Sequence, residues 1–344
     1  MFRVAGQPFR PFYVALASFL ALSVFILAGG LLYQVVASAR DEVAFPLPGR
    51  LVDVGGYRLH IQCSGSQSAG QPTVILESGL GAPGMMWTLV QSDLAKHRRV
   101  CSYDRAGYGW SDPGPEPRTA RHFASELHSL LQNAGEKPPY LLVAHSLGSL
   151  ITRVYTADYP GEVVGLLFID PRHEAFFERM PPEALNIDTR NFQNARWLKL
   201  LTRTGYTRAL GNFGLLSDFE AFLAPLPDDI EAAAWARMIY RPAHWDTAVA
   251  ERESSTVTYA QAGTTHLPQD LPLVVLTAEN GWQAWQTGNE SSDQTGRATW
   301  FALQEEQAHL TAKGKWQVVL GGGHYLYYEQ PGQIINAIDE LLNR

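Results

Sequence analysis

The chain has 344 residues, which is room for one large domain or two modest ones and far more than a domain that depends on disulfides or metals to fold. Hydrophobic residues make up 46% and charged residues 18%, a globular composition that disfavours disorder and coiled coil. The formal net charge of -7 offers no basic surface for nucleic acid. Two cysteines are too few for a disulfide-rich scaffold or a four-cysteine zinc site.

The first element expected along the chain is an N-terminal membrane helix. No charged residue occurs between Arg10 and Arg40, and residues 12–33 are apolar or small throughout. At about 1.5 Å per residue this stretch reaches about 33 Å, which matches the hydrocarbon core of a bilayer. We therefore expect an anchor over residues 1–40 with one transmembrane span. The alternative is a signal peptide, because the small residues that end at Ala39 fit a cleavage site and would release a secreted protein.

The charges that flank this segment predict its orientation. Arg3 and Arg10 precede it without an acidic residue, whereas Arg40 is followed at once by Asp41 and Glu42. The positive-inside rule then places the N-terminus in the cytoplasm and the rest of the chain outside it. The lipid bilayer is thus one expected partner.

Beyond a proline-containing linker, short β-rich stretches alternate with helical ones, as in parallel βαβ units. Apolar residues at helical spacing predict one helix around Phe123 to Leu131 and a closing helix from Ile334 to Leu342. The predicted strands are 51–54, 57–63, 73–76, 99–103, 140–144, 163–169, 273–276 and 316–320.

One long interval interrupts this alternation. Residues 171–270 are mostly helical and loop-like in pattern and contain many aromatic residues. A long segment between consecutive strands of one domain is normally functional. We expect an inserted helical cap over an apolar pocket, although most of its aromatic side chains must form the cap's own core.

The strongest chemical signal is Ser146, which lies between a predicted buried strand and a helix. Small residues flank it at Ala144 and Gly148. A sharp strand-to-helix turn admits only small side chains at these positions, and it lifts the serine oxygen to the end of the sheet under the helix N-terminus. Ser146 is therefore the candidate nucleophile.

Together with other loops in the expected order, this turn resembles the α/β-hydrolase family from about Leu51 onward. The glycine-rich loop at residues 78–81 resembles the family's oxyanion loop, residues 104–111 resemble its glycine-rich turn, and residues 322–324 resemble its histidine loop. The resemblance implies a mostly parallel sheet flanked by helices in a domain over residues 49–344. It also implies His324 as general base and backbone N–H groups of Leu80 and Leu147 as the oxyanion hole.

The acid that orients His324 is less directly indicated. The family often places it after the strand that here is 273–276, but the loop that follows has Glu279 as its one carboxylate and Gly281 near the expected position. The other known position is the end of the preceding strand, where Asp170 precedes Pro171. We expect Asp170 to be the acid and keep Glu279 as the alternative; both retain the chain order serine, acid, histidine.

Several other polar residues are expected to be structural. His145 lies beside the nucleophile on a tight turn, Asp104 and Arg105 belong to a glycine-rich loop, and His173 either faces the pocket or holds the cap. The resemblance places Cys63 and Cys101 on adjacent strands, where a disulfide and two free thiols both remain open.

These observations predict a membrane-anchored serine hydrolase that cleaves a small-molecule carboxylic ester or related acyl bond through an acyl-enzyme, with no cofactor and no metal. The alternatives are another reaction of the same triad (C–C hydrolase, lactonase, acyltransferase or haloperoxidase-like) and a membrane-tethered binding module without catalysis. The sequence does not predict the oligomeric state.

Overall fold

The computed structural model describes residues 10–67 and 70–343, and Arg3, on which the predicted orientation partly rests, lies outside these residues. Within these residues, eight strands form one sheet in the order β1-β2-β4-β3-β5-β6-β7-β8. β2 pairs antiparallel with β1 and β4, and all other pairs are parallel. The strands are β1 (Arg50–Asp53), β2 (Arg58–Ser64), β3 (Thr73–Glu77), β4 (Val100–Tyr103), β5 (Tyr140–His145), β6 (Val163–Ile169), β7 (Leu273–Ala278) and β8 (Gly314–Val319).

The expected α/β-hydrolase fold is confirmed, and each predicted strand matches an observed one to within two residues at either end. Successive residues of the central strands enter different cores, as Ile75 packs on one face of the sheet and Val74 and Leu76 pack on the other. This two-sided burial explains why these strands are continuous apolar runs.

Helices cover both faces of the sheet. One core contains apolar residues of α3 (Ala120–Ala134), α4 (Gly148–Asp158) and α12 (Glu290–Ala308), and the other contains those of α2 (Thr88–Leu94) and α14 (Pro331–Leu342). The shorter elements of the domain are η1 (Gly84–Trp87), η2 (Pro160–Glu162), η4 (Gly281–Trp285) and α13 (Leu326–Glu329).

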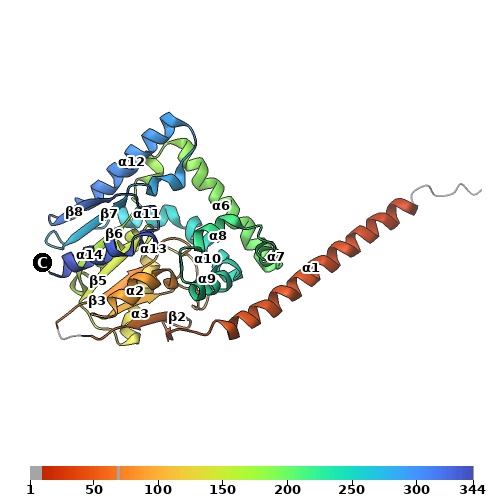
Figure 1. Ribbon diagram of the computed structural model, residues 1–344, viewed down its shortest axis with the longest axis horizontal. Helices are drawn as coiled ribbons and strands as arrows, with labels where there is room; N and C mark the ends of the chain where they lie inside the picture. The colour runs from red at the N-terminus through yellow and green to blue at the C-terminus, as the bar shows by residue number, and fades with distance from the viewer. Residues whose placement is uncertain (1–9, 68–69, 344) are drawn as a thin grey trace, which may run out of the picture.

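The interval between β6 and β7 is helical, and we refer to it as the cap (Figure 1). It begins after the strand that ends at Ile169 and includes one π-helical turn. Its elements are α5 (Phe176–Arg179), α6 (Pro182–Arg203), α7 (Tyr206–Asn212), α8 (Ser217–Leu223), α9 (Asp228–Ala234), η3 (Trp235–Ile239), α10 (Pro242–Glu253) and α11 (Ser255–Gly263).

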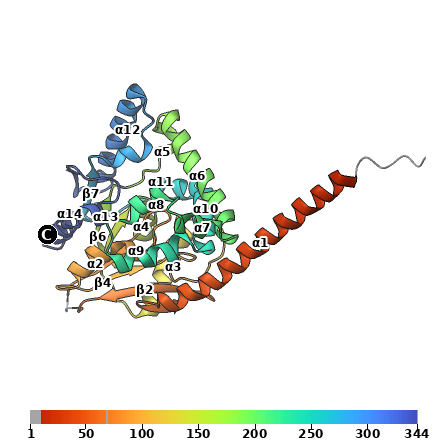
Figure 2. The same cartoon turned by 45° about the vertical axis from the view of Figure 1, so that its right-hand side comes forward.

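The N-terminal helix α1 (Arg10–Ala44) projects away from the domain in both views (Figures 1 and 2). Residues 11–29 are exposed along their whole length, and the helix is long and apolar enough to cross a membrane, with a mean hydropathy of 2.3 in its most apolar window. It extends beyond the predicted span because its last turns pack on the cap. There Gln34 donates to the carbonyl oxygen of Tyr240 at 2.7 Å, and Arg208 pairs with Asp41 at 2.5 Å.

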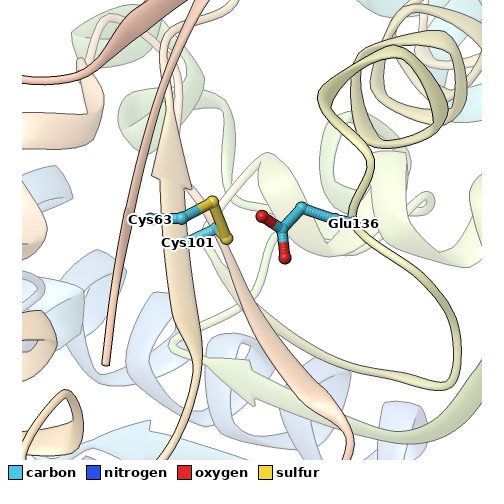
Figure 3. Close-up of side chains that lie close together, drawn as sticks. All are labelled: Cys63, Cys101 and Glu136. Carbon is cyan, nitrogen blue, oxygen red and sulfur yellow. A yellow bond between two sulfur atoms is a disulfide. The ribbon is translucent and has the colours of Figure 1, made fainter. Parts of the chain in front are cut away.

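Cys63 of β2 and Cys101 of β4 are directly opposite each other and form a disulfide (Figure 3). Figure 3 also shows the Glu136 carboxylate directed toward the two sulfur atoms. This is the one group of potential metal ligands found among the described residues, but the sulfurs are bonded to each other and Glu136 receives the Arg99 guanidinium at 2.7 Å. The group is therefore a structural bridge with an adjacent ion pair and does not fit a metal site.

Candidate active site

Ser146 occupies the turn between β5 and α4 with a left-handed backbone, at a φ of 50°. A non-glycine residue in this region is strained, and such strain is concentrated at functional sites. The turn also requires a glycine at position 148, because a Cβ there would lie 2.9 Å from the carbonyl oxygen of Ser78. The small residue two positions after Ser146 is thus demanded by the close approach of the end of β3 to the turn.

Asp170 directly follows β6, and His324, in the loop after β8, lies beside it. Nδ1 of His324 is 2.6 Å from Oδ2 of Asp170, and Asp170 is fully buried. The other carboxylate oxygen accepts from the backbone N–H of Ala278 at 3.1 Å and from the indole N–H of Trp300 at 3.3 Å. Asp170 also has a left-handed backbone, with a φ of 41°. Its carboxylate is thus fixed on three sides and presents one oxygen to the imidazole.

Burial governs the protonation of this pair. Desolvation raises the pKa of Asp170 to about 8, against the hydrogen bonds from Ala278 and Trp300 and the positive charge of Arg172. Desolvation also lowers the pKa of His324 to about 3, and Arg172 acts in the same direction. Both effects oppose a protonated imidazole, and a neutral imidazole is the form that can accept a proton.

Glu279, the alternative acid, lies elsewhere in the same region. Its carboxylate accepts from the backbone N–H of Gly321 at 2.9 Å and lies 3.9 Å from the guanidinium of Arg297, and it is partly exposed. These contacts connect the end of β7 with the loop that carries His324. Among the described residues Glu279 has no hydrogen bond to the imidazole, so its geometry favours a structural role.

A buried ion cluster supports the loop at residues 78–81. Arg105 donates to the carbonyl oxygens of Ser78 at 2.7 Å and Gly79 at 2.8 Å, and its guanidinium pairs with Glu77 at 2.6 Å and with Glu251 of α10 at 2.8 Å. Arg105 thereby joins the loop to both the sheet and the cap. Its structural role follows from these contacts.

The backbone N–H groups of Leu80 and Leu147 make no hydrogen bond within the described part of the chain, and both residues border the same cavity as Ser146. Leu147 precedes the first turn of α4, so its N–H lies at the positive end of that helix. Two unpaired donors beside a serine form the kind of site that binds a developing oxyanion.

A cavity of about 520 Å³ separates these groups from the cap. Its size is that of a small-molecule site. Ser146, His324, Leu80 and Leu147 form its floor. The cap contributes apolar and polar side chains in equal number. The apolar ones are Phe192, Ala195, Phe219, Phe222, Met238, Trp245, Ala248 and Tyr259, and the polar ones are Arg172, Asp188, Asn191, Asn194, Asp218, His244, Arg252 and Ser255.

Four charged residues of the cavity wall escaped the sequence analysis, namely Arg172, Asp188, Asp218 and Arg252. Arg172 and Arg252 each donate to one oxygen of Asp188, at 2.8 Å and 2.5 Å. The Arg172 guanidinium also lies 3.7 Å above the ring of Phe176. Arg172 comes two residues after Asp170, and this proximity is the one signal in the sequence that points to it.

Two further histidines near the site, His145 and His173, have structural roles. Nε2 of His145 contacts the carbonyl oxygen of His324 at 2.8 Å, so it supports the histidine loop. Nδ1 of His173 accepts from the backbone N–H of Ala175 at 3.0 Å, and the neighbouring Glu174 pairs with Arg153 of α4 at 2.5 Å. His173 and Glu174 therefore hold the start of the cap and do not border the cavity.

Comparison with known proteins agrees with this fold. The model of the alpha/beta hydrolase fold family matches residues 72–331. An "AB hydrolase superfamily protein" of Gibberella zeae is 42% identical over 108 residues, which is 30% of this chain and 34% of that protein. The uncharacterized protein YbdG of Bacillus subtilis is 23% identical over 345 residues, 96% of this chain and 94% of that one.

The solved structures extend the likeness to the whole domain. A thermophilic esterase from Thermogutta terrifontis superposes with a TM-score of 0.58 at 20% identity, over 86% of this chain and 97% of that chain, which is a likeness of fold. The first three curated relatives are matched over 20%, 34% and 39% of their own length. The chain therefore corresponds to only part of those proteins.

Proposed function

Because this chain belongs to the α/β hydrolase fold family, we propose that it is a membrane-anchored serine hydrolase that cleaves a carboxylic ester. One observation carries the proposal: the strained Ser146 faces the same cavity as His324, whose imidazole is held at 2.6 Å by the buried Asp170. A serine hydroxyl is a weak nucleophile unless a neutral imidazole takes its proton, and an acid on Nδ1 selects the tautomer that can do so.

The proposed reaction has two halves. Ser146 Oγ bonds to the ester carbonyl carbon while its proton moves to Nε2 of His324, and the carbonyl oxygen becomes an anion held by the N–H groups of Leu80 and Leu147. The C–O bond to the alcohol then breaks, and His324 returns the proton to the leaving oxygen. Water repeats the sequence on the acyl-enzyme, which releases the acid and restores Ser146.

The cavity supports an apolar acyl or alcohol group, since half of the cap residues that line it are aromatic or aliphatic, among them Phe192, Phe219 and Trp245. A lactonase, C–C hydrolase, acyltransferase or haloperoxidase-like reaction would use the same three residues, so a graded series of p-nitrophenyl esters is the direct test of substrate class. The acyl length of the ester with the highest kcat/KM measures how much of the cavity the acyl group fills.

The N-terminal helix supports the anchoring part of the proposal. We assign residues 1–40 to the anchor and residues 49–344 to the hydrolase domain with its cap over 171–270, with the N-terminus in the cytoplasm and the domain outside. Resistance of the membrane-bound protein to carbonate extraction supports the anchor. A mature N-terminus near Arg40 contradicts it and favours the secreted form.

Labelling by a fluorophosphonate probe tests the catalytic part. We expect the wild-type chain to be labelled and the Ser146→Ala variant to remain unlabelled. Asp170→Asn is expected to lower kcat about 10⁴-fold, because the amide favours the wrong imidazole tautomer. Glu279→Gln is the matched control and should retain most of the activity. A folded wild-type protein that takes no label refutes the proposal and favours a binding module.

A further inference from the structure

Five large apolar side chains that lie close together in the cap sequence face solvent. Trp197 and Leu200 belong to α6, Tyr206 and Phe213 lie at the two ends of α7, and Leu215 follows in the next loop. Phe213 is 79% exposed, and Trp197 and Leu215 are each 64% exposed. We call these five residues the cap edge. Exposed apolar side chains gathered in one short segment usually mark an interaction surface.

The cap edge adjoins the point where α1 leaves the domain. Gly30 packs against the backbone of Thr204, where a Cβ on Gly30 would overlap the carbonyl oxygen, and a Cβ on Gly205 would lie 2.6 Å from the carbonyl oxygen of Gly30. Asn212 donates to the hydroxyl of Tyr33 at 2.9 Å. In both views α7 lies next to the middle of α1 (Figures 1 and 2). The end of α6 and both ends of α7 are therefore fixed to one level of the anchor.

That level coincides with the expected surface of a bilayer. Residues 11–29 are all exposed. From Gly30 onward one face of α1 is buried, with Gly30 partly and Gln34 fully buried, while residues 31–33 and 35–36 on the other face stay exposed. The exposed segment is about 28 Å long at 1.5 Å per residue, close to the ~30 Å hydrocarbon core of a membrane. If residues 11–29 span the bilayer, Gly30 and the cap edge beside it lie where the hydrocarbon ends.

The charges of the surrounding segment fit the headgroup region. Residues 189–217 contain five basic residues and no acidic residue. Three of the five, Lys199, Arg203 and Arg208, form ion pairs with Asp246 or Asp41. Aromatic and leucine side chains interspersed with basic residues are typical of segments that lie in the membrane interface.

We propose that the cap edge docks into the surface of the lipid bilayer beside α1, so that the hydrolase takes its ester from the lipid phase. The inference rests on the proposed anchor. The helix α6 connects the cavity with the cap edge. It contributes Phe192 and Ala195 to the cavity, and Trp197 and Leu200 to the cap edge. An apolar ester dissolved in the membrane then reaches the cavity past this helix without crossing bulk water.

Spin labels on the full-length protein in phospholipid vesicles test the docking. Because both native cysteines are bridged, a single introduced cysteine carries the label. We choose Phe213→Cys in the cap edge, Leu22→Cys in the anchor and Lys313→Cys beside β8 as the control. In Figure 1 β8 lies on the opposite side of the domain from α1. Collision with dissolved oxygen and with a water-soluble nickel chelate reports how deeply each label is immersed in lipid.

The three labels separate the two proposals. We expect the labels at positions 22 and 213 to be protected from the nickel chelate and the label at 313 to be accessible. A water-accessible label at 213 with a protected label at 22 overturns the docking and leaves the anchor standing. A water-accessible label at 22 refutes the anchor itself.

Activity gives a second readout. The double variant Phe213→Ser with Leu215→Ser alters only exposed side chains outside the cavity. It should retain wild-type kcat/KM on a water-soluble short-chain ester and lose activity several-fold on a long-chain ester dissolved in the vesicles. Equal rates of the wild-type protein and the double variant on the vesicle-borne ester contradict delivery from the membrane.

Discussion

Gly281 lies directly against the carboxylate of Asp170, so closely that a Cβ on Gly281 would overlap Oδ2. The loop after β7 is the place where many relatives carry the acid, and here it is occupied by a residue without a side chain. The two positions are mutually exclusive because they direct a carboxylate at the same space. The carboxylate at the end of β6 therefore requires a glycine after β7.

Gly281→Ala should inactivate the enzyme while the fold remains. The added methyl group displaces the Asp170 carboxylate from Nδ1 of His324, and kcat should fall by an amount that approaches the effect of Asp170→Asn, on the order of 10⁴-fold. Steady-state kinetics and circular dichroism measure the two effects. Gly332→Ala is the matched control, because a Cβ there has open space. Wild-type activity in Gly281→Ala argues that Asp170 does not orient the imidazole.

The pH profile should have one rising limb that belongs to the His324–Asp170 pair. When the carboxyl and imidazole groups together hold two protons, the pair is neutral overall and Nε2 has no free lone pair. When they hold one proton, the pair is an anion and Nε2 can act as the base. Burial disfavours that anion and raises the pKa of Asp170 to about 8, so kcat/KM should increase with pH up to about 8 and fall on acidification.

The positive charge of Arg172 should set the pH at which kcat/KM rises. Arg172 lowers the pKa of Asp170, whereas His145 stays neutral because burial lowers its pKa well below the usual value. Arg172→Gln should therefore move the midpoint of kcat/KM to higher pH, and Arg172→Lys should largely restore it. A midpoint that stays constant, or moves to lower pH in Arg172→Gln, contradicts this electrostatic role.

Local sequence patterns were sufficient for the sheet and for the turn at Ser146, because buried strands and tight turns restrict residue type over short distances. The residues of the cavity wall had no such pattern. Asp188 meets Arg172 and Arg252 only after α6 and α10 pack together, and Trp300 reaches Asp170 from a helix 130 positions away. The contact of Gly30 with Thr204 is equally non-local, so the predicted span over 12–33 included residues that pack on the cap.

The disulfide should stabilise the edge of the sheet. Replacing both Cys63 and Cys101 by alanine removes a crosslink between β2 and β4 with a sequence separation of 38. The free energy of unfolding should fall by about 2 to 4 kcal/mol, since the crosslink restricts the unfolded chain. Denaturant titration measures the loss, and thiol titration of unreduced, denatured protein should find no free thiol. Two free thiols in that titration contradict the bridge.

Glu251 should couple the cap to the oxyanion loop. It is buried on α10, accepts from Arg105 at 2.8 Å and from the hydroxyl of Tyr108 at 2.9 Å, and Arg105 in turn holds the carbonyl oxygens of Ser78 and Gly79. Glu251→Gln keeps the size of the side chain but places an amide N–H against the guanidinium. We expect the free energy of unfolding to fall by about 1.5 to 3 kcal/mol, the usual contribution of hydrogen bonds to charged groups.

The same substitution should lower kcat, because the loop that carries the N–H of Leu80 loses part of its support. Glu253→Gln is the matched control, since Glu253 lies on the same helix and is exposed. Denaturant unfolding and steady-state kinetics on both variants separate the two effects. If the two variants have the same stability and the same kcat, Glu251 contributes neither to the attachment of the cap nor to the position of the loop, and Glu77 alone holds Arg105 at 2.6 Å.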